Sequence, residues 1–268
     1  MPESSGQSEL TAAAGALARA RRVAVLTGAG VSAESGLRTF RGATAADLPA
    51  DMQALWKEFD PMRLATPEAF DADPAMVTRW YDWRRLGCLA AEPNPGHRAL
   101  ATLEGRLGGA SGSFHLLTQN VDRLHQKAGS RNVVELHGSI IEWRCVRTGR
   151  AFLPPPEPFE SFPPPSPHAA GAVLRPNVVW FGEALPEAAL AAAYAAAESC
   201  DLFMSVGTSS VVYPAAGFLD VASANGAVTI EVNREPTPIS ERVDHCLLGR
   251  SGEVLPALLR AAFDADAR

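Results

Sequence analysis

Four polar side chains of this sequence have types and positions suited to chemistry on a nucleotide: His137, Gln119, Asn120 and Asp122. Each follows a short apolar run that predicts a buried strand. The carboxyl ends of parallel strands meet at one edge of a sheet, where such folds bind ligands. Amides and a carboxylate there can hold a ribose and an amide, and a histidine is a candidate general base because its pKa lies near working pH. Taken singly, each residue favours a structural role.

A glycine-rich segment provides a second signal of a binding site. Gly28, Gly30 and Ala33 complete the pattern G-x-G-x-x-A directly after an apolar run at 22–27. We expect Gly28 to permit a tight turn, Gly30 to let backbone amides approach a diphosphate, and Ala33 to let the next helix pack closely. A turn that only joins a strand to a helix is the alternative, because this pattern alone is weak.

The elements that must position these residues alternate between strands and helices. Apolar runs predict buried strands at 22–27, 114–118, 201–206 and 227–232. Helices are predicted at 9–20 and 214–225. This alternation indicates an α/β fold with a parallel, Rossmann-like sheet.

Two segments interrupt the alternation and predict a smaller second lobe. Residues 41–92 contain short helical patterns, among them a helix capped by Asp73 with Pro74 at its first position. Residues 142–176 include a proline-rich stretch, which predicts an extended, partly mobile loop. We therefore predict a disordered start at 1–8, a Rossmann-like domain of 9–40, 93–141 and 177–268, and a small lobe of 41–92 and 142–176.

Composition excludes several classes of function. The net charge of −6 over 268 residues gives no reason to expect a nucleic-acid partner. No apolar run approaches the ~20 residues of a membrane span, and the polar N-terminus contains no apolar signal segment. The four scattered cysteines form no CxxC pair, which fits a reducing compartment better than a disulfide framework. We expect a cytoplasmic monomer without a membrane partner.

Six segments, in order, resemble the motifs of the sirtuin family over roughly residues 20–260. They read GAGVSAESGLRTFRG (28–42), TQNVDRLHQKAG (118–129), LHG (136–138), VVWFGE (178–183), GTSSVVYP (207–214) and EVNRE (231–235). The resemblance implies NAD as co-substrate and acyl-lysine proteins or peptides as partners. In sirtuins the acyl oxygen displaces nicotinamide from NAD, and the products are lysine, nicotinamide and O-acyl-ADP-ribose.

The resemblance also implies roles for individual residues. His137 would be the general base, while Asn120 and Asp122 would orient the nicotinamide amide and a water. Phe40 would cover the nicotinamide, and Thr39 stands where many family members carry Asp. The implied NAD-binding residues are Gly28, Ala29, Gly30, Ala33, Glu34, Thr39, Phe40, Arg41, Gln119, Asn120, Asp122, Gly207, Thr208, Ser209, Asn233, Glu235 and Ser251.

Three residues bear on the identity of the acyl group. Tyr81 and Arg84 are three apart on a predicted helix, so they share a face and could bind a carboxylate. They match the Tyr-x-x-Arg pair of the sirtuin branch that removes succinyl and malonyl groups and retains some deacetylase activity. Ala65 matches the small residue that widens the acyl pocket there. An aromatic residue packed in the core beside an exposed arginine is the alternative.

A substrate peptide is expected to bind as an extended strand between two loops. Residues 210–213 would form one wall, and the other wall would include Val179, Phe181 and Gly182.

The chain departs from most sirtuins at the structural zinc site. Cys145 occupies the first ligand position, but Thr148 stands at the second, and residues 167–170 replace the second Cys-x-x-Cys pair with PHAA. Cys145 and His168 supply two ligands at most, whereas structural zinc needs four. The sequence therefore predicts a degenerate zinc-ribbon-like module without metal.

Three other functions remain open. An ADP-ribosyltransferase could use the same site to modify a protein. A nicotinamide-dependent oxidoreductase fits the glycine pattern, although a clear acidic ribose ligand is missing. A silent NAD-binding module is disfavoured by His137, Asn120 and Asp122.

Overall fold

The computed structural model describes residues 3–37, 61–108 and 112–263 and contains a six-stranded parallel sheet. The strand order is β3-β2-β1-β7-β8-β9, and every neighbouring pair is parallel. The strands are β1 (Arg22–Thr27), β2 (Ser113–Thr118), β3 (Val133–Glu135), β7 (Leu202–Val206), β8 (Val228–Asn233) and β9 (His245–Leu248). The predicted α/β, Rossmann-like class is thus confirmed.

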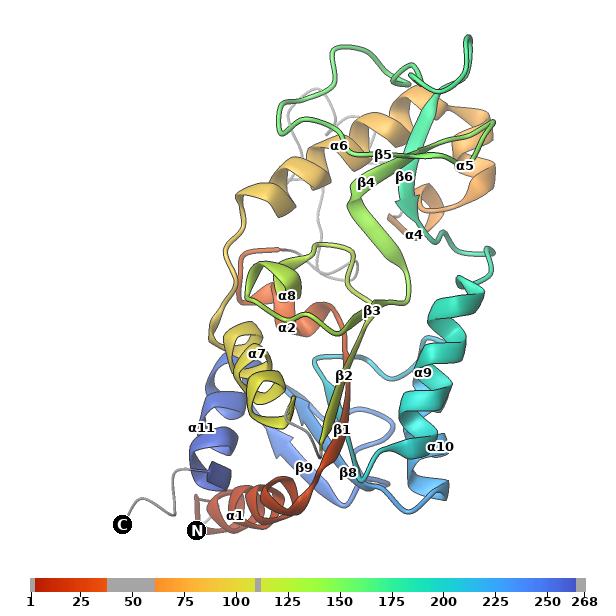
Figure 1. The fold of residues 1–268 in the computed structure, drawn as a ribbon. Helices are drawn as coiled ribbons and strands as arrows, with labels where there is room; N and C mark the ends of the chain where they lie inside the picture. The colour runs from red at the N-terminus through yellow and green to blue at the C-terminus, as the bar shows by residue number, and fades with distance from the viewer. Residues whose placement is uncertain (1–2, 38–60, 109–111, 264–268) are drawn as a thin grey trace.

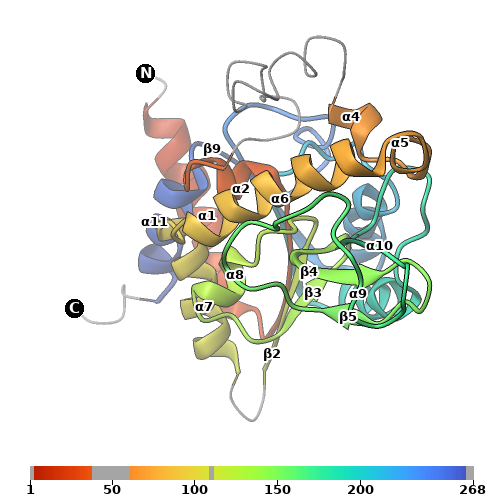
Figure 2. The same ribbon diagram turned by 90° about the horizontal axis from the view of Figure 1, so that it is seen from above.

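Helices cover both faces of this sheet (Figure 2). One face packs against α1 (Glu3–Arg19), α7 (Pro95–Leu107) and α11 (Ser251–Phe263), and the other against α9 (Glu187–Ser199), the short η2 (Ala215–Gly217) and α10 (Phe218–Ala224). In β1, Val23 and Val25 contribute to the first core, while Ala24 and Leu26 contribute to the second. This alternation follows from the two-residue period of a strand. Among the described helices, none is long and apolar enough to cross a membrane.

The smaller lobe lies above the carboxyl edge of the large sheet in Figure 1, with the short helices α2 (Ala29–Ala33) and α8 (Leu124–Lys127) between them. Its helices are α4 (Pro61–Leu64), α5 (Pro67–Ala72) and α6 (Pro74–Ala90). They pack on an antiparallel sheet of β5 (Ala151–Phe152), β4 (Gly138–Cys145) and β6 (Leu174–Val178). As predicted, the Asp73 side chain caps α6 by accepting a hydrogen bond from the Met76 amide at 2.9 Å.

The proline-rich segment is anchored by a buried ion pair on α6. Arg85 donates to Asp82 at 2.8 Å and to the carbonyl oxygens of Pro155 and Glu157, each at 2.7 Å. Asp82 in turn accepts from the Phe159 amide at 3.1 Å. The segment is irregular as expected, these contacts join its backbone at residues 155–159 to α6, and its partial mobility stays a prediction.

Three predicted boundaries differ from the structure. Residues 3–8 were expected to be disordered, yet α1 already begins at Glu3. Once a helix is nucleated, each added residue contributes one hydrogen bond, so the amphipathic part at 9–20 extends toward the N-terminus. The predicted domain boundaries between residues 141 and 142 and between residues 176 and 177 fall inside β4 and β6, respectively. Both strands continue from the large domain into the small lobe. The short edge strand β9 was not predicted.

Candidate active site

Loops from β1 and β7 meet at the carboxyl edge of the sheet because glycine allows their backbones to touch. The Gly30 amide donates to the Gly207 carbonyl at 2.8 Å, and a Cβ on Gly30 would lie 2.7 Å from that oxygen. Gly207 itself has a φ of +60°, a conformation that favours glycine. The Gly30 amide and the absence of a side chain at Gly30 thus serve the packing of these two loops, and the expectation that Gly30 lets backbone amides approach a diphosphate stays a prediction.

Asn120 and Asp122 converge on one buried serine of α2. The Asn120 side-chain amide donates to the Gly28 carbonyl at 3.0 Å and to the Ser32 hydroxyl at 3.1 Å. Ser32 donates to Asp122 Oδ2 at 2.7 Å, while Asp122 Oδ1 accepts from the Leu124 amide at 2.9 Å. Ser32 was not among the predicted site residues, although it lies within the glycine-rich motif. The structure thus connects the loops after β1 and β2 through one hydroxyl.

Burial controls the ionisation of Asp122. It raises the pKa of this carboxyl group above its usual range, against the hydrogen bonds from Leu124 and Ser32 and the positive charge of Arg84. The influence of Arg84 places α6 within electrostatic range of the sheet edge. The ionisation of Asp122 therefore depends on the charge of Arg84 in the small lobe.

His137 is held by the backbone of the neighbouring loop. Its Nδ1 lies 3.0 Å from the Gln119 carbonyl oxygen, which can only accept a hydrogen bond. Nδ1 therefore carries the hydrogen, and Nε2 of the neutral ring is an acceptor with no hydrogen-bond partner among the described residues. Burial lowers the pKa of His137 below its usual value, so the neutral form persists at neutral pH. This arrangement can accept a proton from a hydroxyl group.

Predicted cofactor residues from five segments form hydrogen bonds with one another. Gln119 donates to the Thr208 hydroxyl at 3.0 Å, and Asn233 donates to the Thr208 carbonyl at 2.8 Å. Glu34 accepts from the Ser251 hydroxyl at 2.7 Å, which ties α2 to the start of α11. These contacts involve the loops after β1, β2, β7 and β9 and the last residue of β8.

The remaining predicted cofactor residues are distributed unevenly. Ala29 and Ala33 lie in α2, Ser209 is half-buried after β7, and Glu235 is exposed beyond the end of β8. Thr39, Phe40 and Arg41 lie outside the described residues.

Sequence reasoning missed a buried histidine pair beneath the site. The rings of His97 and His125 lie 4.7 Å apart, and burial lowers their pKa values to about 4 and about 3. His125 contacts the Thr27 hydroxyl at 3.0 Å, and His97 forms a capping box with Asn94 at the start of α7. The Asn94-Pro95 pair is a helix-start signal that could have identified the cap. Both histidines are neutral at neutral pH.

The three residues expected at the acyl group lie on the small lobe. Tyr81 and Ala65 are buried, and burial raises the pKa of Tyr81 to about 12. The Arg84 guanidinium lies 5.6 Å from the centre of the Tyr81 ring, as expected for residues three apart on a helix. The Ala65 carbonyl accepts from the Phe181 amide at 2.9 Å, which joins the acyl side to the predicted peptide wall.

The degenerate zinc module is organised by hydrogen bonds. The hydroxyls of Ser166 and Thr148 bond to the Cys145 sulfur and lower the pKa of its thiol to about 6. His168 contacts the Ala151 carbonyl at 2.9 Å. Within residues 3–37, 61–108 and 112–263, no group of three or more His, Cys, Asp or Glu side chains could hold a metal. Serine and threonine hydroxyls are poor substitutes for thiolates as zinc ligands, so these residues do not fit a structural zinc.

Comparison with known proteins identifies relatives over nearly the whole chain. Residues 28–214 match the Sir2 family. The NAD-dependent protein deacylase 1 of Pseudomonas aeruginosa is 51% identical over 253 residues, covering 92% of this chain and 96% of the relative. The NAD-dependent protein deacylase 2 of Pyrobaculum aerophilum is 49% identical, covering 91% of this chain and 92% of the relative.

Solved structures extend the similarity to three dimensions. A Sir2 homologue in complex with NAD superposes with a TM-score of 0.83 at 42% identity, covering 94% of this chain and 93% of that one. A second homologue, bound to a myristoylated histone peptide, superposes with a TM-score of 0.73 at 31% identity, covering 97% and 99%. The fold is therefore shared along with the sequence.

Proposed function

The chain belongs to the Sir2 family, and from this premise we propose that it is an NAD-dependent deacylase of protein lysines. The observation that carries the proposal is the fixed tautomer of His137 at an edge lined by amides and hydroxyls. The relatives named NAD-dependent protein deacylase support the same activity.

The donor set at the sheet edge suits NAD. Gln119, Asn120 and Asn233 offer side-chain amides, Ser209 and Thr208 offer hydroxyls, and such groups hydrogen-bond ribose and amide functions directly. When bound, NAD supplies the ribose carbon that takes up the acyl oxygen as nicotinamide leaves. The residues of the chain then have to orient this ribose and move a proton from it.

His137 and its neighbours perform these tasks in the proposed reaction. Nε2 of His137 removes the proton from a ribose hydroxyl, so that this oxygen can attack the acyl carbon. Asn120 and Asp122 orient the nicotinamide amide and a nearby water, and Ser32 holds both side chains in place. Gly28, Gly30 and Gly207 allow the two loops that frame the cofactor to approach each other.

We assign succinyl and malonyl groups as the preferred acyl groups, with acetyl as a weaker substrate. The Arg84 guanidinium beside the Tyr81 ring supports this preference, since arginine binds a carboxylate by two parallel hydrogen bonds. The small side chain of Ala65 leaves room for a longer acyl chain than acetyl. The charge of Arg84, which favours the ionised form of Asp122, supports an acyl pocket that opens on the catalytic edge.

The peptide is assigned to a groove with two loop walls. Val179 donates its amide to the His137 carbonyl at 2.9 Å, and the next residue but one, Phe181, is 41% exposed. In the second predicted wall, Val211 and Tyr213 are 45% and 74% exposed, which supports an apolar surface that a partner could cover. One related structure contains a myristoylated histone peptide, and another contains an acetylated peptide.

A panel of acyl-lysine peptides with NAD, followed by mass spectrometry, tests the proposal. We expect free lysine peptide, nicotinamide and O-acyl-ADP-ribose to form together, most rapidly from succinyl or malonyl peptide. His137→Ala should lower turnover by about 100-fold or more, as loss of a general base does. Turnover within threefold of the unmodified protein would contradict the role of His137. Transfer of ADP-ribose to protein without deacylation, or reduction of NAD, would replace the proposed activity with one of its alternatives.

A further inference from the structure

Arg123, the residue after Asp122, has a backbone conformation that residues other than glycine rarely adopt. Its φ is +61° and its ψ is +20°, in the left-handed region. Among the described residues other than glycine, only Arg123 and Ser210 have a positive φ. Such a conformation costs free energy and persists only where the surrounding contacts require it, which occurs most often at functional sites.

The Arg123 side chain forms a two-pronged contact with Glu135 of β3. Nε lies 3.0 Å from Oε1, and Nη2 lies 3.4 Å from Oε2. Gln126 donates to the same carboxylate at 2.8 Å, so Glu135 accepts hydrogen bonds from two residues of the segment after β2. Nη2 of Arg123 also lies 3.7 Å from Glu142 of β4. Arg123 thus joins the segment after β2 to both β3 and β4.

The Arg123–Glu135 pair connects the two chain segments that carry the groups assigned to the reaction. Asp122 directly precedes Arg123, and His137 follows Glu135 by two residues. Burial is the main cause of the raised pKa of Asp122, and the negative charge of Glu135 adds to it. The two carboxyl groups are therefore within electrostatic range of each other. A change in this pair should consequently affect Asp122 on one side and His137 on the other.

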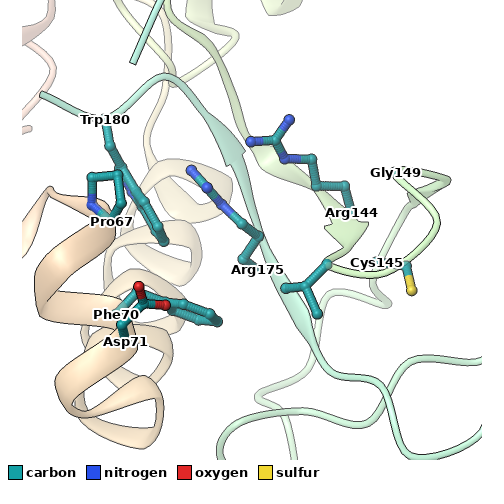
Figure 3. Close-up of a pocket in the computed structure, with 9 residues that line it drawn as sticks. Pro67, Phe70, Asp71, Arg144, Cys145, Gly149, Arg175 and Trp180 are labelled. Carbon is teal, nitrogen blue, oxygen red and sulfur yellow. The ribbon is translucent and has the colours of Figure 1, made fainter. Parts of the chain in front are cut away.

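Two other arginines share a carboxylate in the small lobe. Arg144 and Arg175 line a cavity of about 330 Å³ (Figure 3), and they approach Glu183 to 3.7 and 2.7 Å, respectively. None of the residues that line this cavity is assigned to NAD or to the acyl group. Arg123, by contrast, contacts the strand that precedes His137 and the strand that follows it.

The Arg123–Glu135 pair contributes little to stability, because both side chains are partly exposed. Arg123 is 35% exposed and Glu135 is 22% exposed, and water screens ion pairs of this kind. The left-handed conformation of Arg123 has a free-energy cost of its own. A contact that adds little to stability and accompanies an unfavourable backbone conformation is better explained by the geometry that it imposes on the site.

We propose that Arg123 is a positioning residue for the deacylation reaction, in which its contact with Glu135 sets the placement of Asp122 relative to His137. The left-handed turn at Arg123 lets the Leu124 amide donate to Asp122 Oδ1 at 2.9 Å. Glu135 holds this turn against the strand that leads to His137. In this role Arg123 contacts neither NAD nor the acyl group. The proposal rests on the proposed deacylase activity, whatever acyl group is preferred.

Steady-state kinetics of the Arg123→Gly variant test this role, together with its free energy of unfolding from chemical denaturation. The substrate is the acyl-lysine peptide that the unmodified chain turns over fastest. We expect kcat to fall by about tenfold and KM for NAD to change by less than about twofold, because misplaced reacting groups slow the chemical step. Stability should not fall, since glycine adopts a positive φ without strain. A parallel loss of kcat and stability would indicate a structural role and overturn the proposal.

Arg22→Gln is the matched control for the loss of a partly exposed arginine–carboxylate pair. Nε and Nη2 of Arg22 donate to Asp201 at 3.0 and 2.6 Å, and Arg22 lies at the start of β1, at the opposite end of that strand from the site. This variant should leave kcat unchanged. A loss of kcat equal to that of Arg123→Gly would overturn a specific role for Arg123.

Removal of Glu135 tests the contact itself. Glu135→Ala should also lower kcat by about tenfold, and the double variant Arg123→Gly/Glu135→Ala should be no slower than either single variant, because both changes remove the same contact. A double variant about 100-fold slower than the unmodified protein, as expected for independent sites, would overturn the proposal. An active unmodified protein with an unchanged kcat for Arg123→Gly would overturn the role of Arg123 alone. Absence of turnover by the unmodified protein would overturn the deacylase assignment and this role with it.

Discussion

At the scale of single residues, the Nδ1 hydrogen of His137 is committed to the backbone carbonyl of Gln119, 3.0 Å away. This bond selects the tautomer, and the partly buried surroundings keep the ring neutral. Asp122 responds to burial in the opposite direction, since its pKa is raised. In both cases burial disfavours the charged form of the side chain. The histidine is therefore neutral and able to accept a proton, while the pKa of the carboxyl group moves toward neutral pH.

The pH dependence of kcat/KM should report the lowered pKa of His137. The base acts only when neutral, so activity falls as the pH drops through the pKa of the free enzyme. Because burial places that pKa below the usual 6.5, we expect the midpoint of the acid limb below pH 6.5. Steady-state rates at several pH values, with stability checked at each, provide the measurement. A midpoint above 6.5 would disagree with the buried, neutral ring.

The buried histidine pair should make stability depend on pH. His125 has a pKa of about 3 in the folded chain and about 6.5 when unfolded, so the unfolded state binds more protons between these values. Stability is therefore fully present above pH 6.5 and is lost as the pH falls, by up to about 1.4 kcal/mol per pH unit for one such group. Chemical denaturation at pH 7 and pH 5.5 should show a smaller difference for His125→Asn than for the unmodified protein. Equal differences would rule out this linkage.

At the scale of elements, α6 serves the site and the small lobe at once. Tyr81 and Arg84 are the pair proposed to bind the acyl carboxylate, while Asp82 and Arg85, each the next residue in the chain, hold the proline-rich segment. The helical spacing made the first pair predictable. The carbonyl partners of Arg85 are 70 and 72 residues away, and the Phe159 amide that donates to Asp82 is 77 residues away, so no local pattern of α6 identifies them.

Substitution of Arg84 tests the acyl preference. Arg84→Met keeps the length of the side chain but removes the guanidinium, so we expect desuccinylation to fall at least tenfold and deacetylation to change by much less. Rates with matched succinyl and acetyl peptides, both at saturating NAD, provide the comparison. If both rates fall by the same factor, the pair does not bind the acyl carboxylate.

Substitution of Arg85 tests the anchor of the proline-rich segment. Arg85→Met leaves Asp82 buried without its ion-pair partner, and loss of one member of such a pair costs about 3 kcal/mol or more. We expect that decrease in the free energy of unfolding, together with faster proteolysis within residues 155–159. Arg150→Met, at an exposed position, should change stability by less than about 0.5 kcal/mol. Equal stabilities for the two variants would show that the pair does not anchor the segment.

At the scale of the whole molecule, two lobes share strands that cross between them. β4 begins just after His137, and β6 ends just before Val179, so the antiparallel sheet is attached directly to both sides of the site. The Arg175–Glu183 ion pair, with the Trp180 amide donating to Glu183 at 2.9 Å, then fixes the predicted peptide wall to this lobe. We therefore expect the order of the small lobe to affect the position of the proposed peptide substrate.

The metal content of the purified chain tests how that lobe is stabilised. Hydrogen bonds around Cys145, the Arg85 anchor and the packing of Trp143 on Phe159 at 4.8 Å hold the module together in the described structure. We expect less than about 0.1 zinc per chain by elemental analysis and no change in Tm on addition of a chelator, because four suitable ligands are missing. One zinc per chain would overturn the prediction.

The sequence by itself determined the parallel sheet, the capped helix at Asp73 and the grouping of polar residues at the strand ends. Each of these depends on a short-range cause: strand and helix periodicity, a side chain that caps its own helix, or a residue that directly follows a strand. Only the tertiary structure decided that Gly30 packs against Gly207, that Ser32 joins Asn120 to Asp122, and that Arg85 holds a distant loop. These contacts join segments far apart in the chain, and their energies come from burial and close approach, which exist only once the chain has folded.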